Sequence, residues 1–197
     1  GLVSTGPAMA RTLPLLVGVV TFFFFTAEVW QSVGTLESGA YAFAVLLFVA
    51  VSAAFLYTRN RLDLDALGRF ETGAELAEAL HATPLRGRAD DVRLPAACPL
   101  TRGQSRNLRL VATVSRLVVA SVVGGCVFLF FGALGTIAIT TETVASWTQT
   151  EPTVILDLAT TERTYAVTLP LLRVAGFLAV FSGFYYAVVS VVDPTMR

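Results

Sequence analysis

Three ionisable side chains lie within long apolar stretches of the sequence: Glu28, Arg116 and Arg173. A charged side chain in hydrocarbon costs several kcal/mol, so it normally faces a protein interior or water and has a partner. Arg116 stands at the edge of its apolar stretch, where a long side chain can extend to a polar surface. Glu28 and Arg173 lie farther inside and carry opposite charges. They are the strongest candidates for chemistry in this chain.

Glu28 and Arg173 are expected at a similar depth if both lie on membrane-spanning helices. At a helical rise of 1.5 Å per residue, Glu28 lies about 22 Å from the inner end of the first apolar stretch. Arg173 lies a few residues inside the outer end of the last stretch. The sequence therefore predicts an intramembrane Glu28–Arg173 pair. The pair either fastens the bundle or lines an outward-facing cavity for an ion, a proton or a polar substrate.

The other reactive side chains form no catalytic or metal-binding pattern. His81 is the only histidine, which excludes a multi-histidine metal site and a haem with two histidine ligands within one chain. Cys98 and Cys126 form no CxxC pair, so neither a disulfide nor a metal site is expected. Cys126 lies in an apolar stretch and should pack as a small hydrophobic residue. Without a nucleophile-elbow motif, we expect no enzymatic activity, no cofactor and no metal.

The composition indicates a membrane protein. Of the 197 residues, 55% are hydrophobic and 14% are charged, whereas a soluble domain carries about a quarter charged residues. The net charge is zero, and the 14 basic residues, all arginines, form no cluster of the kind that binds nucleic acid. The chain begins at Gly1, so we expect a processed or truncated chain. The first apolar stretch is too long for a signal peptide and lacks a cleavage site.

Four apolar stretches approach the roughly 20 residues that span about 30 Å of hydrocarbon. The predicted spans are residues 13–36, 40–57, 117–139 and 165–192. A three-residue turn between the first two forces an antiparallel hairpin. We therefore predict an all-α membrane protein, a single domain over residues 1–197 with four transmembrane helices as two antiparallel hairpins. A small helical insertion occupies the loop 58–106, and a polar loop covers 140–163.

Two capping-box patterns predict helix starts in the polar segment between the second and third spans. Thr72 and Glu75 have the spacing in which each side chain bonds the other residue's backbone N–H, so a short helix should run to about His81. Thr101 and Gln104 repeat the pattern before the third span. The third helix should therefore begin in the polar segment, well before its spanning part.

The distribution of arginine predicts the orientation. Nine arginines lie in or beside the segment between the second and third spans: Arg59, Arg61, Arg69, Arg86, Arg88, Arg93, Arg102, Arg106 and Arg109. The other loops hold only Arg163. Because cytoplasmic loops are enriched in basic residues, we expect this segment and both termini on the cytoplasmic side of a bacterial plasma membrane. Trp30 and Trp147 should then be interfacial aromatics near the outer surface.

Small residues recur at steps of three and four along the last two predicted helices. On the third helix they are Ser121, Gly125, Gly132 and Gly135, with Phe128 between them; on the fourth they are Gly176, Ala179, Gly183, Ala187 and Ser190. Small residues allow helices to approach closely in lipid, where no hydrophobic force drives them together. We expect the third and fourth helices to pack along these two stripes.

Three short motifs carry a resemblance to a known family. They are TAEVWQ at 26–31, PLTRGQ at 99–104 and FSGFYY at 181–186, followed by Asp193 near the end. Over all four spans the chain resembles a family of uncharacterised four-pass integral membrane proteins of high-GC Gram-positive, actinobacterial-type bacteria. The resemblance implies the same four-span topology and draws attention to Glu28. It implies no particular activity.

Two classes of function remain open. Four helices leave little room for a substrate path within one chain, so we expect a homo-oligomer or a protein partner within the lipid bilayer. The first class is an accessory or scaffold subunit, whose arginine-rich inner segment meets anionic lipid or a partner. The second is a homo-oligomeric channel or small transporter, with Glu28 and Arg173 near its outer mouth. A continuous polar helix face would favour the second class. The first helix has only a broken one, and we therefore favour the first class.

Overall fold

The computed structural model describes residues 6–59, 69–70, 72–84, 96–97, 100–159 and 164–192, and the chain is mostly helical. The helices are α1 (Gly6–Phe24), α2 (Ala27–Val29), the π-helix η1 (Trp30–Gly34), α3 (Ser38–Arg59), α5 (Gly73–Leu80), α6 (Arg102–Ala138), α7 (Thr141–Thr148) and α8 (Leu169–Val192). The strands are β1 (Arg69–Phe70), β2 (Ala96–Ala97), β3 (Val154–Ala159) and β4 (Thr164–Thr168).

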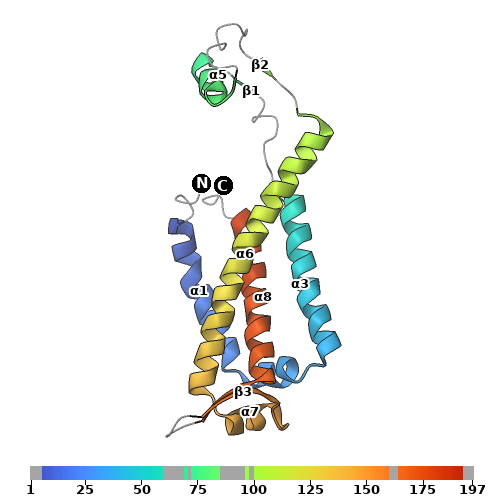
Figure 1. Ribbon diagram of the computed structural model, residues 1–197, viewed down its shortest axis with the longest axis vertical. Helices are drawn as coiled ribbons and strands as arrows, with labels where there is room; N and C mark the ends of the chain where they lie inside the picture. The colour runs from blue at the N-terminus through green and yellow to red at the C-terminus, as the bar shows by residue number, and fades with distance from the viewer. Residues whose placement is uncertain are drawn as a thin grey trace. The chain divides into compact units, whose positions relative to one another are not determined.

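The chain divides into two compact units. The larger unit joins Gly1–Arg59 to Thr113–Arg197, and the smaller unit is Asn60–Ala112. The larger unit contains four long helices together with α2, η1, α7 and the antiparallel β3–β4 hairpin (Figure 1). The insertion predicted at 58–106 corresponds closely to the smaller unit.

Helix α8 is the central element of the larger unit. It is the most buried of the three longest apolar helices. It packs against α3, against η1 and against α1, and α6 crosses it where Gly124 meets Ala179 (Figure 1). Its sequence explains this position, because α8 carries no charged residue other than Arg173 and is rich in small and aromatic residues that fit between neighbours.

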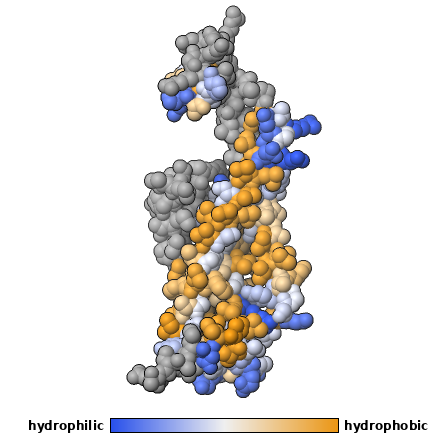
Figure 2. Space-filling view, viewed as in Figure 1, coloured by the Kyte–Doolittle hydropathy of each residue, from blue (hydrophilic) through white to orange (hydrophobic). Residues whose placement is uncertain are grey.

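In the part of the chain that the structure describes, three helices are long and apolar enough to cross a membrane: α3, α6 and residues 169–191 of α8. A fourth span results if the bent pair formed by residues 15–24 and 27–34 counts as one. The predicted span 40–57 lies within α3, and the predicted span 117–139 follows α6 to its end. Apolar residues cover the face of these helices seen in Figure 2, and more polar residues gather at the end formed by α7.

The first predicted span is not a single straight helix. Helix α1 ends at Phe24, and the segment that follows is bent by 70°. The prediction of one helix over 13–36 is therefore wrong beyond Phe24. No proline or glycine marks this bend. The side-chain hydrogen bonds described below stabilise the bend, because they occupy carbonyl groups at the end of α1.

The predicted loop 140–163 contains regular structure. Thr140 caps α7, because its hydroxyl accepts a hydrogen bond from the N–H of Thr143 at 3.3 Å. The hairpin that follows pairs Val154 with Thr168, and a register shift lies between Val154 and Leu156. The fourth helix consequently begins at Leu169, since the residues placed at the start of its span belong to β4. The all-α prediction is corrected by this small sheet.

Within the smaller unit, the structure confirms the first capping box. Thr72 and Glu75 exchange hydrogen bonds at the start of α5, and Leu76 is the buried residue of that helix. The second capping box is also present, since Thr101 N–H donates to Gln104 Oε1 at 2.9 Å and Thr101 Oγ1 accepts from the N–H of Gln104 at 3.4 Å. Strands β1 and β2 form one short antiparallel pair.

Candidate functional site

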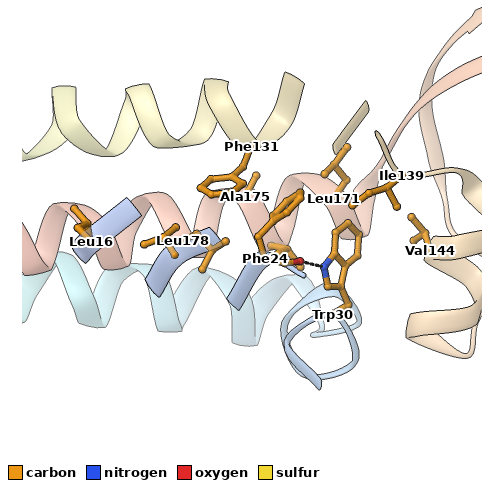
Figure 3. Close-up of a cluster of buried hydrophobic side chains, with 11 residues drawn as sticks. Leu16, Phe24, Trp30, Phe131, Ile139, Val144, Leu171, Ala175 and Leu178 are labelled. Carbon is orange, nitrogen blue, oxygen red and sulfur yellow. Dashed lines mark hydrogen bonds between the residues drawn. The ribbon is translucent and has the colours of Figure 1, made fainter. Parts of the chain in front are cut away.

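Side-chain hydrogen bonds fix the bend that follows α1. Thr26 has an extended backbone (φ −93°, ψ 116°), which interrupts the helix. Its hydroxyl donates to the carbonyl of Phe22 at 2.7 Å. The indole Nε1–H of Trp30 donates to the carbonyl of Phe24 at 2.6 Å (Figure 3). Because the last carbonyls of a helix need partners, these two bonds stabilise the end of α1 at this point.

Trp30 anchors the bent segment in the core. Its side chain is 0% exposed, and its ring lies 5.7 Å from Phe24 and 5.4 Å from Trp147, centroid to centroid. These residues belong to one cluster that also includes Phe131 and Leu171 (Figure 3). Trp30 is therefore a core residue of the bundle, because the bend turns its indole inward; its expected position near the outer surface of a membrane stays a prediction. Trp147 is half-buried.

The bent segment continues as the π-helix η1. Ser32 and Thr35 donate their hydroxyl hydrogens to the carbonyls four residues earlier, Glu28 at 2.6 Å and Gln31. A π-helical turn is rare and occurs frequently at functional sites. Here the turn presents Ser32 and Val33 to the same groove as Glu28.

Glu28 lines an apolar groove of about 390 Å³ bounded by α1, the bent segment, α3 and α8. Four phenylalanines line it as well, Phe23, Phe48, Phe177 and Phe181. Phe48 meets the rings of Phe177 and Phe181 edge to face, at centroid distances of 5.8 and 6.5 Å. The Glu28 side chain is exposed, and no hydrogen bond or ion pair holds its carboxylate among the described residues.

Arg173 binds the opposite end of the same bent segment, where η1 turns into α3. Its guanidinium donates to the carbonyl of Gly34 at 3.3 Å and to Ser38 Oγ at 3.0 Å. The hydroxyl of Tyr41 donates in turn to the carbonyl of Arg173 at 3.1 Å. Arg173 thus connects α8 to the turn between η1 and α3.

The structure does not join Glu28 to Arg173. Across the described part of the chain no ion pair links the two, and the partners of Arg173 are Gly34 and Ser38. The physical reason is the bend after Phe24. A straight first helix would have carried Glu28 along α8 at the depth inferred from the helical rise. The bent segment instead brings its carboxyl-terminal carbonyls, which need donors, to the guanidinium.

The two stripes of small residues are confirmed in part. Gly135 lies against Leu171, and Gly183 lies against the carbonyl of Ala120, which a Cβ at 183 would approach to 3.1 Å. A Cβ at Gly124 would lie 2.8 Å from the carbonyl oxygen of Ala179. The close approach of α6 to α8 therefore uses Gly124 and Ala120.

Several predicted members of the stripes lie elsewhere. A Cβ added at Gly125 or Gly132 would meet no atom within 4 Å, and Ser121 is exposed. These three positions are therefore wrong as α6–α8 contacts. Gly176 faces mainly Tyr41 of α3, against which a Cβ would collide, although that Cβ would also lie 3.9 Å from the Phe128 ring of α6. Around Gly124 the seam on α6 lies one residue earlier than predicted, whereas Gly135 lies in it as predicted; the helix crosses α8 at an angle that the spacing alone does not give.

The remaining candidate residues show no assembled chemistry. Cys126 is free and exposed and lines a second apolar groove, of about 350 Å³, between α1 and α6; its expected place in the core is wrong. His81 is the exposed residue that ends α5, Arg116 is half-buried on α6, and Cys98 lies outside the described residues. The described residues contain no group of three or more His, Cys, Asp or Glu that could hold a metal ion.

Two features of this site were not predicted from the sequence. The partners of Arg173 were one. Ser38 and Tyr41 lie in the first turn of α3, after a short connection. The polar side chain of Ser38 at the start of an apolar helix was the sequence signal that could have identified it as a partner of Arg173. The aromatic lining was the other. Phe177 and Phe181 stand four residues apart and therefore share one face of a helix, a signal that neither the charges nor the small residues reveal.

Comparison with known proteins returns no match: no protein-family model, no curated protein and no solved structure is detectably similar to this chain.

Proposed function

We propose that the chain is a multi-pass integral membrane protein of a bacterial cytoplasmic membrane, with four spans arranged as two antiparallel hairpins. Both termini and the segment 58–106 lie on the cytoplasmic side, and the turn before α3 and the α7–hairpin region lie outside. Three to four long apolar helices and the concentration of arginine in and beside 58–106 support this arrangement. Basic residues favour the cytoplasmic side of a membrane.

Within that membrane we propose that the chain is an accessory or scaffold subunit, which binds a transmembrane helix of a protein partner. The observation that carries this proposal is an apolar groove of about 270 Å³ between α3 and α6, with α8 as its floor. Its lining includes Ser52, Ser121, Gly124, Gly125 and Gly183. Small residues at a helix surface permit a second helix to approach closely.

The open small residues on α6 strengthen this proposal. Among the described residues, a Cβ at Gly125 would meet no atom within 4 Å, and the partner of the Ser121 hydroxyl is the carbonyl of Leu117 on its own helix, at 2.9 Å. Both face away from the α6–α8 seam. A lipid-facing surface needs no glycine, whereas glycine in a helix interior lowers helix stability by about 1 kcal/mol relative to alanine. A docked helix would account for both residues.

The packing of the bundle favours this function over a channel formed by one chain. The described core is built from aliphatic and aromatic side chains, and the buried hydroxyls of Ser52, Ser182 and Ser190 bond to carbonyls of their own helices. These serines form no polar path through the bundle. Conduction would therefore need several copies around a common axis.

The test is the composition of the complex extracted from its native membrane, with wild-type protein and two leucine variants. Gly125→Leu fills the groove between α3 and α6, and Ala133→Leu adds similar bulk at an exposed position of the same helix that lines none of the grooves described. We expect a stoichiometric foreign protein with wild type and Ala133→Leu, and its loss with Gly125→Leu. A closed homo-oligomer without a foreign protein would overturn the accessory function and favour a pore.

A further inference from the structure

The groove that contains Glu28 differs from the two apolar grooves described along α6. Those two grooves have no charged residue in their lining. The Glu28 groove combines a carboxylate with four phenylalanine rings, contributed by α1, α3 and α8. Its volume of about 390 Å³ falls in the range of about 300–1,000 Å³ that is typical of small-molecule sites.

The chemistry of this lining selects a ligand by charge. Aromatic rings attract a cation toward their faces when it lies within about 6 Å of the ring centre. Phe48 meets Phe177 and Phe181 at interplanar angles of 87° and 77°, so these ring pairs do not stack face to face. An anion would be repelled by the carboxylate of Glu28 and would gain no attraction from the ring faces that favour a cation.

Glu28 is available to such a ligand. The carboxylate has no protein partner in the described part of the chain, while Arg173, the cation predicted to pair with it, is held by Gly34 and Ser38. The main-chain carbonyl of Glu28 already accepts a hydrogen bond from the hydroxyl of Ser32, so the side chain is the group that Glu28 offers to a ligand. The charge that the lining presents is therefore a free carboxylate at the rim of an aromatic surface.

We propose that this groove binds a monovalent organic cation with an apolar or aromatic body, which places its charge at Glu28 and its body against Phe48, Phe177 and Phe181. This binding site is independent of the scaffold function. The proposed membrane placement determines only how the ligand reaches the groove, so the purified protein in detergent should bind the ligand as well.

Two probes of the same shape and opposite charge test the proposal on the wild-type protein. Tetraphenylphosphonium is the cation and tetraphenylborate is the anion, and each is titrated into purified protein in neutral detergent by equilibrium dialysis. We expect saturable binding of one tetraphenylphosphonium per chain and no saturable binding of tetraphenylborate. Equal binding of both ions would overturn the proposal, because it would show hydrophobic partition without charge selection.

Variants then assign the charge and the rings. Glu28→Gln keeps the shape of the side chain and should weaken tetraphenylphosphonium binding about tenfold, and Phe48→Leu should weaken it about threefold. Glu37→Gln removes an exposed carboxylate in the turn before α3, outside the groove lining, and should leave the affinity unchanged. An unchanged affinity in Glu28→Gln would overturn the assignment. The wild-type comparison of the two ions stands even if a variant does not fold.

Loss of this binding and failure of the scaffold function are distinguishable. If the protein binds tetraphenylphosphonium but is extracted from its membrane without a foreign protein, the cation site is supported and the scaffold function is overturned. If the protein is extracted together with a foreign partner but binds both tetraphenyl ions equally, the scaffold function is supported and the cation site is overturned.

Discussion

At the scale of single residues, Arg173 shows how a charge on a long apolar helix can be satisfied without a counter-ion. Its guanidinium bonds to a backbone carbonyl at the end of η1 and to a serine hydroxyl at the start of α3. Arginine suits this role because its planar fork of donors can bind two acceptors at once. Carbonyls at the end of a helix carry partial negative charge, so they attract the guanidinium as a carboxylate would.

A double-mutant cycle separates this arrangement from an ion pair. Arg173→Gln should lower the free energy of unfolding by about 1–3 kcal/mol, since it removes two hydrogen bonds from a charged donor. Ser38→Ala should lower it by less, and the combined variant should lose less than the sum of the two. Arg173→Gln combined with Glu28→Gln should be additive within about 0.5 kcal/mol, because these residues share no partner.

The measurement is unfolding in mixed detergent micelles, followed by the fluorescence of the two tryptophans. Coupling between Arg173 and Glu28 that exceeds the coupling between Arg173 and Ser38 would contradict the structure and support the ion pair predicted from sequence. The sequence could identify both charges as unusual, because their cost in hydrocarbon depends on residue type alone. The sequence could not identify the partners of these charges, since the partners depend on a bend at which no proline or glycine stands.

At the scale of elements, the sequence was most informative where the signal is local. Capping boxes at Thr72 and Thr101 and the long apolar periods of α3 and α6 depend on neighbouring residues only, and all are present. The bend after Phe24 depends on the burial of Trp30 against Trp147, a residue more than a hundred positions away. Strand β3 pairs with residues that hydropathy assigned to a helix. Such long-range contacts override local preference.

The seam between α6 and α8 offers a test of register with two adjacent glycines. Gly124→Ala should destabilise the protein by about 1–3 kcal/mol, the usual cost of overpacking, because its Cβ would lie 2.8 Å from a backbone oxygen of α8. Gly125→Ala should be neutral or stabilising by up to about 1 kcal/mol, because alanine is the better helix former and its Cβ meets open space.

The same unfolding assay reads both variants, and each serves as the control for the other. The reverse order of stability would place Gly125 in the seam, as the stripe of small residues alone indicated. At this crossing the spacing was correct, since the predicted pair Ser121 and Gly125 and the observed pair Ala120 and Gly124 both stand four residues apart. One residue separates them, and one residue turns a helix by about 100°. Only the position of the neighbouring helix chooses between the two.

At the scale of the whole molecule, the first helix decides the topology. Helix α1 has 19 residues, or about 28 Å at 1.5 Å per residue, close to the hydrocarbon thickness of about 30 Å. It could therefore cross the membrane before the bend, with α2 and η1 lying at the outer surface. If it does not cross, three spans remain and the amino terminus lies on the outer side.

Labelling by a membrane-impermeant maleimide distinguishes the two topologies. In a chain with Cys98→Ser and Cys126→Ala, single substitutions Glu37→Cys, Glu142→Cys and His81→Cys each place a thiol at an exposed position. We expect intact cells to label positions 37 and 142 and to protect position 81. An epitope added at the amino terminus should become accessible only after permeabilisation.

The amino-terminal epitope distinguishes the two topologies, because the three cysteine variants are expected to give the same labelling pattern in both. In both proposed topologies α3 is the span between positions 37 and 81, and the placement of α6 and α8 does not depend on α1. An epitope accessible on intact cells would therefore establish a re-entrant first segment and three spans. Arg11 argues for the protected outcome, since a basic residue at that end of α1 favours the cytoplasmic side, as do the arginines that follow α3.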